Sequence, residues 1–222
     1  MLSSLAYGAM RAGRNLALTL ALPVAAAHAD PTTTILALGD SLTAGYGLAE
    51  HEGLVPRLND WLAKNGADAV VLDGGVSGDT SAGGLSRMDW SLTPDVDAMI
   101  VTLGGNDLLR GLPPEVTRAN IDAILTKAGD RNLPVLLIGM KAPGNFGPDY
   151  KTSFDSLYPE LAAQHGALHV DSFFGLLDPN AADLGNLSGF ILDDGIHPNA
   201  TGVQKIVSNL GPIVLDLIAR TN

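Results

Sequence analysis

Five short apolar segments, separated by amphipathic helical segments, constrain most strongly what this chain can fold into. We expect strands at residues 35–38, 69–72, 98–103, 134–140 and 167–170, and helices at about 51–66, 83–90, 113–129, 150–165 and 200–219. Strands that are apolar throughout and alternate with helices are typical of a parallel sheet covered on both faces. We therefore predict an α/β fold in three layers (α/β/α), with a flavodoxin-like five-stranded parallel sheet of order 2-1-3-4-5.

Glycine-rich loops follow the first three of these strands. Their sequences are Gly39-Asp40-Ser41-Leu42, Ser77-Gly78-Asp79-Thr80 and Gly104-Gly105-Asn106-Asp107. The order 2-1-3 makes the strands neighbours, so the loops should meet at the edge where open α/β sheets bind ligands. There Ser41 could be a nucleophile, glycine lets a backbone N–H approach a substrate, and Asn106 offers an amide to an oxyanion. Taken singly, each glycine loop is better explained as a tight turn, and Ser41 is explained equally well as a helix N-cap.

A nucleophilic serine needs a base, and His197 is the best candidate. The other histidines are His28, His51, His165 and His169. His28 lies in an N-terminal segment that resembles a secretory signal, and His51 is too near Ser41 in sequence. His165 ends a predicted helix and His169 lies in a predicted strand, so we expect these two side chains to face apart rather than to bind a metal. The long segment 171–197 can reach the first strand, at about 3.3 Å per residue.

Asp194 precedes His197 by three residues, so a single turn brings its carboxylate to the imidazole. Such a contact fixes the tautomer of the base and stabilises the imidazolium that forms during attack. Asp193, four residues before His197, competes for this role. The loop aspartates Asp40, Asp79 and Asp107 are expected instead to brace their loops by accepting from nearby backbone N–H groups.

The three loops and the segment Asp194-Gly195-Ile196-His197 together resemble the SGNH hydrolases, also called the GDSL esterase/lipase family. The four blocks stand in the family's order. Within the family, the chain is similar to the bacterial periplasmic group of thioesterase I, lysophospholipase and arylesterase. The runs that carry this closer similarity are Gly39–Tyr46 and Asp193–Asn199.

The resemblance implies Ser41 as nucleophile, His197 as base and Asp194 as its partner. It implies an oxyanion hole made of the backbone N–H groups of Ser41 and Gly78 and the Asn106 amide. The expected function is hydrolysis of carboxylic esters and thioesters (aryl esters, acyl thioesters, lysophospholipids) through an acyl-enzyme on Ser41. Neither a metal nor an organic cofactor is expected. Alternatives on the same fold are a carbohydrate O-acetyl esterase, an acyltransferase or a non-catalytic ligand-binding protein.

Other classes of protein fit less well. An α/β-hydrolase would carry Gly-x-Ser-x-Gly, which this sequence lacks. A magnesium-dependent phosphatase would use the loop aspartates but would leave Asn106 and His197 without a role. Dinucleotide binding is disfavoured because Gly45-Tyr46-Gly47 lies too far beyond the first strand and lacks a third glycine.

The apolar residues after Asn106 are candidates for substrate binding. Leu108, Leu109 and Leu112 should border the mouth of the site, where they could hold an acyl chain. Packing of the same leucines against the next helix is an equally good explanation.

The N-terminus predicts export. Residues 1–29 resemble a secretory signal, with Arg11 and Arg14 before an apolar stretch and Ala27-His28-Ala29 as a cleavage site; an uncleaved anchor is the alternative. We therefore expect residues 30–222 to be the catalytic domain of a periplasmic or secreted protein without a stable membrane anchor. Its net charge of −13, two units below the −11 of the whole chain, argues against nucleic acid as a partner. The chain has no cysteine, which excludes disulfides and thiol nucleophiles.

Overall fold

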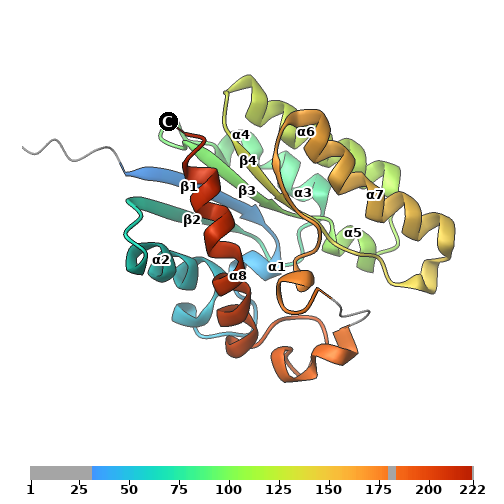
Figure 1. Cartoon of the computed structure of the whole chain (residues 1–222). Coiled ribbons are helices and arrows are strands. Elements are labelled where there is room, and N and C mark those ends of the chain that lie inside the picture. Colours follow the sequence, from blue (N-terminus) through green and yellow to red (C-terminus); the bar gives the residue numbers. More distant parts are fainter. Residues whose placement is uncertain (1–31, 180–183, 222) are drawn as a thin grey trace, which may run out of the picture. The chain divides into compact units, whose positions relative to one another are not determined.

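A parallel β-sheet organises the chain. The computed structural model describes residues 32–179 and 184–221, so the leader expected at 1–29 lies outside the described residues. The strands are β1 (Thr33–Gly39), β2 (Ala69–Gly75), β3 (Ala98–Thr102), β4 (Val135–Ile138) and β5 (Leu168–Val170). All neighbouring pairs are parallel, in the order β2-β1-β3-β4-β5 (Figure 1). The predicted fold class and strand order are both confirmed.

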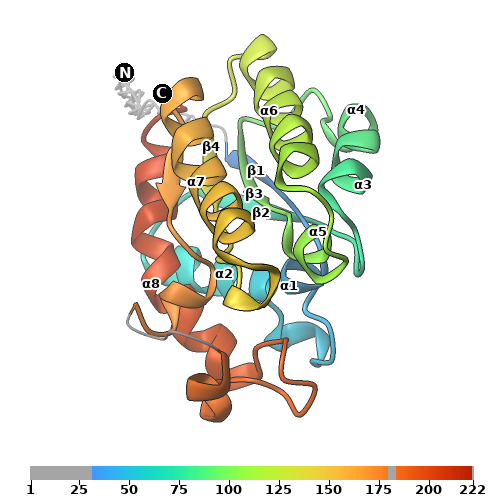
Figure 2. The ribbon, with the colours of Figure 1, turned by 90° about the vertical axis from the view of Figure 1, so that its right-hand side faces the viewer.

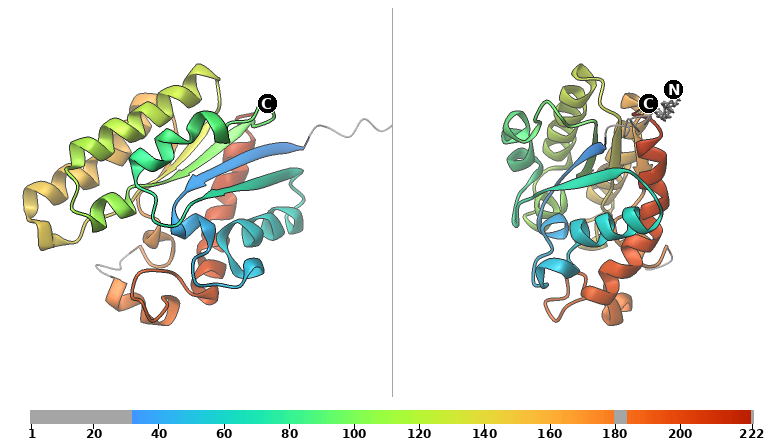
Figure 3. Two further views of the ribbon diagram at one scale, coloured as in Figure 1. Left: turned by 180° about the vertical axis from the view of Figure 1, so that it is seen from behind. Right: turned by 90° about the vertical axis from the view of Figure 1, so that its left-hand side faces the viewer.

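Helices cover both faces of the sheet, as Figures 2 and 3 show from several sides. One face carries α2 (Leu54–Lys64) and α8 (Ala200–Ile218), which contact each other. The other face carries α3 (Ser81–Ser86), α4 (Met88–Ser91), α6 (Pro114–Asp130) and α7 (Pro148–His165). Because both faces are covered, every residue of β3 and β4 is buried. This is why these strands are apolar at every position except Thr102 instead of alternating.

Some elements differ from those expected. The edge strand β2 continues beyond residue 72, since Gly74 and Gly75 pair with the end of β1. The helix expected at 83–90 is divided into α3 and α4 at Arg87, whose backbone leaves the helical region. The helix expected from residue 51 begins three residues later, after a 3₁₀ turn (Glu50–Glu52) and the N-cap Gly53. Two short helices, α1 (Ser41–Ala44) and α5 (Gly105–Leu109), were not predicted.

Three further 3₁₀ segments lie in the connections, at Gly144–Phe146, Phe174–Leu176 and Leu184–Phe190. No helix among the described residues is long and apolar enough to cross a bilayer.

The register of the sheet aligns the ends of three strands. Gly39, the last residue of β1, pairs with Gly75 on one side and with Thr102 on the other. These are also the last residues of β2 and β3. The three glycine-rich loops therefore start from adjacent positions at the carboxyl edge of the sheet, as the sequence predicts.

Candidate active site

Ser41 is the first residue of α1, directly after the turn that ends β1. The N-cap of this helix is Asp40, whose carboxylate accepts from the backbone N–H of Leu42 at 3.0 Å. The alternative of Ser41 as N-cap is therefore wrong. Gly39 makes the turn possible, because a side chain at this position would collide with Thr43. At the first position of a helix, the backbone N–H of Ser41 has no acceptor within the helix.

His197 lies between Ser41 and Asp194. Its Nε2 is 2.8 Å from Ser41 Oγ, and its Nδ1 is 2.7 Å from Asp194 Oδ2. The pKa of Asp194 is lowered to about 2, chiefly by the backbone N–H of His197 and also by the N–H of Ile196 and the imidazole. An ionised carboxylate only accepts, so His197 Nδ1 donates to it and Nε2 is free to accept from the Ser41 hydroxyl. This connected set has the geometry of a serine-hydrolase triad.

A tight turn holds Asp194 and His197 together. Leu192 donates to the carbonyl of His197 at 2.8 Å, and Gly195, at φ +73°, donates to the carbonyl of Leu192 at 3.0 Å. Asp194 Oδ1 accepts from the backbone N–H groups of Ile196 (2.9 Å) and His197 (3.0 Å). The three-residue offset thus works as predicted. Asp193 is exposed, and the structure brings Asp194, not Asp193, to the imidazole.

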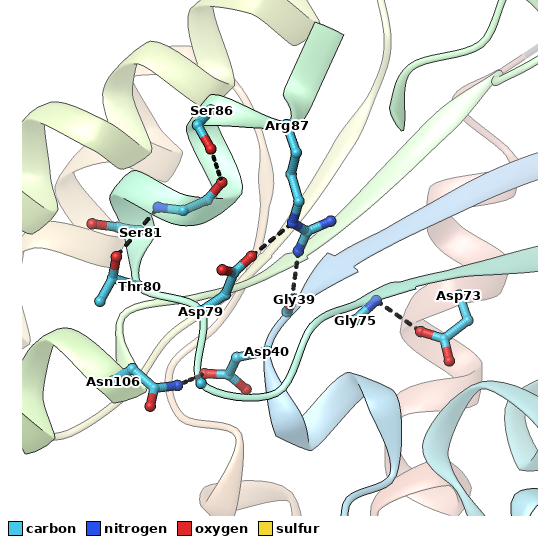
Figure 4. Close-up of polar contacts among 12 residues, drawn as sticks. Gly39, Asp40, Asp73, Gly75, Asp79, Thr80, Ser81, Ser86, Arg87 and Asn106 are labelled. Carbon is cyan, nitrogen blue, oxygen red and sulfur yellow. Dashed lines mark hydrogen bonds and ion pairs between the residues drawn. The ribbon is translucent and has the colours of Figure 1, made fainter. Parts of the chain in front are cut away.

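Asn106 contacts the residue next to the serine. Its Nδ2 donates to Asp40 Oδ2 at 3.2 Å, as Figure 4 shows. Burial raises the pKa of Asp40 to about 6, against the bonds from Leu42 and Asn106, which lower it. Asp40 braces its own loop as expected, and it also fixes the amide of another loop. This second contact was not predicted from the sequence.

Two arginines bind the loop that carries Gly78. Gly78 has φ +86°, a conformation that glycine adopts without strain, in a turn closed by the Asp79 N–H and the Val76 carbonyl (3.0 Å). Arg110 donates to the Gly78 carbonyl at 2.8 Å. Arg87 donates to Asp79 at 2.7 Å (Figure 4). The expectation that Asp79 binds nearby backbone N–H groups is therefore wrong, because its carboxylate forms an ion pair.

Asp107 connects two loops rather than bracing its own. Its carboxylate is fully buried and accepts from both the N–H (2.7 Å) and the hydroxyl (2.5 Å) of Ser81, the first residue of α3. Thr117 of α6 donates to the same carboxylate at 3.2 Å. We expected a bond within the loop, but the donors come from other elements. The loops of Gly78 and Asn106 are thereby joined beneath the surface.

Of the three leucines predicted to border the mouth of the site, only some reach the surface. Leu108 is buried in the core, as packing would require, whereas Leu109 is exposed and Leu112 is half-buried. The ring of Tyr46 lies 4.5 Å from that of His197, centroid to centroid, a contact that sequence reasoning missed. Its position in the run from Gly39 to Tyr46 was the available signal.

The other described histidines lie apart from this site. His51 is exposed in the 3₁₀ turn before α2, and His165 at the end of α7 contacts Asp122 Oδ1 at 2.6 Å. His169 belongs to β5, with Nε2 buried and unpartnered. Within residues 32–179 and 184–221, no group of three or more His, Asp or Glu side chains could hold a metal ion.

The sequence matches the GDSL-like lipase/acylhydrolase family over residues 37–205, a stretch that contains all four blocks of the site. The chain belongs to this family. Curated relatives of this chain are named as ester-cleaving enzymes. Esterase TesA of Pseudomonas aeruginosa is 36% identical over 204 residues, covering 91% of this chain and 96% of TesA. Thioesterase 1/protease 1/lysophospholipase L1 of Escherichia coli is 36% identical over 170 residues, covering 75% and 76%.

Solved structures agree with the fold. The crystal structure of AlinE4, a SGNH-hydrolase family esterase, is 40% identical and superposes with a TM-score of 0.67, covering 85% of this chain and 97% of AlinE4. The fold is thus that of the SGNH hydrolases, and this family member is a hydrolase that acts on ester bonds.

Proposed function

We propose that the protein hydrolyses carboxylic esters and thioesters through an acyl-enzyme on Ser41. The observation that carries this proposal is the connected pair of contacts from Ser41 Oγ through His197 to Asp194, at 2.8 and 2.7 Å. A serine hydroxyl is a weak nucleophile unless an adjacent base removes its proton. Here the base is next to the hydroxyl, and a carboxylate holds the imidazole in the required tautomer.

The reaction proceeds in two halves. His197 Nε2 takes the Ser41 proton as Oγ attacks the carbonyl carbon, and the tetrahedral intermediate collapses when His197 protonates the leaving alcohol or thiol. Water then attacks the acyl-enzyme by the same route, releases the acid and regenerates Ser41. Asp194 stabilises the imidazolium in both halves.

An oxyanion hole completes the proposed site. The donors are the backbone N–H groups of Ser41 and Gly78 and the Asn106 amide. Two features support this assignment: Ser41 begins a helix, and a side chain added at Gly78 would meet no atom within 4 Å, so the space beside this residue is open. Preorganised donors of this kind are usually a large part of the catalysis of acyl transfer.

Small acyl esters and thioesters are the proposed substrates, with Leu109 and Leu112 beside the acyl chain. The relatives' names, esterase and thioesterase/lysophospholipase, favour this class over a carbohydrate O-acetyl esterase or an acyltransferase.

We also propose that residues 1–29 are a cleaved export signal and that 30–222 act outside the cytoplasm. Arg11, Arg14 and the Ala27-His28-Ala29 site support this part of the proposal.

The test is direct observation of the acyl-enzyme. Mixing the protein with p-nitrophenyl acetate should release a burst of nitrophenol equal to the enzyme concentration, and mass spectrometry of the quenched protein should locate the acetyl group on Ser41. Ser41→Ala is the control and should give neither. Steady turnover without a burst or adduct, retained in Ser41→Ala, would overturn the proposal. A binding protein would show no turnover.

A further inference from the structure

Arg87 lies between the end of β1 and the loop that carries Gly78 (Figure 4). Its Nε donates to Asp79 Oδ2 at 2.7 Å, and its Nη2 donates to the Gly39 carbonyl at 2.8 Å. We propose that Arg87 is a positioning residue that sets the separation of the Ser41 and Gly78 backbone donors. This inference rests on the proposed function, because it assigns those two N–H groups to the oxyanion hole.

The two acceptors of Arg87 flank the two donors in the chain. Gly39 stands two residues before Ser41, and Asp79 directly follows Gly78. The Gly39 carbonyl also accepts from the Val76 N–H at 3.1 Å. One guanidinium therefore joins the strand end that carries the nucleophile to the far side of the loop that carries Gly78.

The contacts are sheltered from water. The side chains of Arg87 and Asp79 are 16% and 20% exposed, so screening weakens this pair far less than an exposed surface pair. Gly83, one turn into α3, leaves the space that the Asp79 carboxylate fills, because a side chain there would collide with it. Arg87 itself separates α3 from α4, and this break in the helix directs its side chain back toward β1.

The planar fork of arginine suits this arrangement. It presents two N–H groups in fixed directions, whereas lysine offers a single flexible ammonium group. Lysine at position 87 can keep the charge but cannot reproduce the fixed directions of the two N–H groups. An arginine–lysine exchange is therefore a sharp probe of whether geometry or charge matters here.

Separation of the donors matters because an oxyanion needs them at about 2.7–3.1 Å. A displacement of about 1 Å from a change far from the chemistry can lower the rate about 100-fold. Loss of Arg87 should leave ground-state binding unaffected, since no substrate contact is removed. The effect should fall on kcat and on the affinity for transition-state analogues.

The experiment compares Arg87→Met, Arg87→Lys and Asp79→Ala with a matched control, Arg118→Met. Arg118 forms an exposed ion pair with Glu160 at 2.6 Å, away from the site, so its loss controls for losing an arginine ion pair. Hydrolysis of p-nitrophenyl butyrate is measured per active site, counted by complete labelling with a fluorophosphonate, together with the Ki of an alkyl trifluoromethyl ketone. Circular dichroism reports the melting temperature of each variant.

Arg87→Met should lower kcat about 10- to 100-fold, with KM within twofold, and raise the ketone Ki by the same factor as kcat/KM falls. Arg87→Lys should recover only part of this loss. Asp79→Ala should change the same quantities less, since the Gly39 bond remains, and Asp79→Ala with Arg87→Met should be no worse than Arg87→Met alone. Arg118→Met should match wild type.

Unchanged kcat per active site in Arg87→Met, or a change in KM alone, overturns the inference even where the melting temperature falls. A drop in kcat without a change in the ketone Ki also overturns it. If Arg87→Met does not fold, Arg87→Lys and Asp79→Ala decide by the same criteria. Failure of the proposed function looks different, because wild type itself would then lack a fluorophosphonate adduct on Ser41.

Discussion

The two halves of the site are built in opposite ways. Ser41 stands at the end of a buried strand and is itself buried, beside a carboxylate that water scarcely reaches. Asp194 stands in an exposed turn after the last strand, with a pKa lowered by local hydrogen bonds rather than raised by burial. By contrast, burial raises the pKa of Asp40, the residue before Ser41, to about 6.

The contacts that hold each half also differ in range. The turn around Asp194 is closed by bonds that span two to five residues. The half around Ser41 depends on bonds between loops: Asp40 with Asn106, Arg87 with Gly39, and Asp107 with Ser81. The acid–base half can therefore be altered locally, whereas a change in the other half reaches several loops.

The largest effect should come from breaking the hydrogen bond between Ser41 and His197, which joins the halves. Ser41→Ala should lower kcat about a million-fold, on the scale of nucleophile deletion in subtilisin. Because the base acts only through the serine, Ser41→Ala with His197→Ala should be no slower than Ser41→Ala alone. Steady-state kinetics on the two variants test this. A further large loss in the double variant would mean that His197 works independently of Ser41.

The next largest effect tests the exposed half. Asp194→Asn should lower kcat by up to about 10,000-fold, the cost of the corresponding change in trypsin, because the amide offers the imidazole the wrong partner. Asp193→Asn is the matched control and should stay near wild type, since its side chain is exposed and the imidazole is bonded to Asp194 instead. Kinetics with circular dichroism as a folding check decide between them. The opposite ranking would move the triad to Asp193.

A smaller loss is expected from the buried half. Asn106→Ala should lower kcat about 100- to 1,000-fold with little change in KM, because the amide is proposed to bind the oxyanion more strongly as charge develops. If KM rises while kcat is kept, Asn106 binds the ground state instead. The measurement is a full substrate-saturation curve for wild type and variant.

The smallest loss should follow Asp40→Asn, at about tenfold in kcat, because Asn106 loses a charged acceptor. In wild type, protonation of Asp40 as pH falls through about 6 should lower kcat/KM and steepen its fall on the acid side. The variant should lack this contribution. A pH profile of equal steepness in both proteins would exclude Asp40 from activity.

The Asp40 carboxyl should also affect stability, but here low pH favours the folded protein whereas it lowers activity. A raised native pKa means that the folded protein binds more protons than the unfolded chain between about pH 4 and 6. The contribution of Asp40 to stability is therefore greatest below pH 4 and declines as pH rises to 6. Asp40→Asn should flatten the pH dependence of the melting temperature in this window.

Patterns of local sequence predicted the fold and the exposed half well. Apolar strands and the predicted order of parallel neighbours were enough to bring the loops of Ser41, Gly78 and Asn106 to one edge. The offset of Asp194 from His197, together with the family resemblance, favoured Asp194 over Asp193, because a carboxylate three residues away can meet the imidazole within a single turn.

The contacts between loops could not be predicted in this way. Asp79 looks like a loop-bracing residue until α3 brings Arg87 to it, and Asp107 finds its partner 26 positions away in sequence. Such pairs depend on where a helix starts and on which way a side chain leaves it. The pattern of apolar residues specifies neither, since one residue of helix shift moves a side chain by about 100°.

The turn from Leu192 to His197 is held in shape by hydrogen bonds among its own residues. The backbone hydrogen bonds that close it, from Leu192 to the His197 carbonyl and from Gly195 to the Leu192 carbonyl, both lie within the segment, and an antiparallel bridge between Ile191 and Pro198 closes its base. A segment of this kind is transferable: the connection that precedes it can lengthen or shorten over evolution while the acid and the base keep their mutual geometry. Only its placement against α1 must be conserved. Diversity of substrates in such a scaffold can therefore arise in the connection, with the proton-transfer pair inherited as one piece.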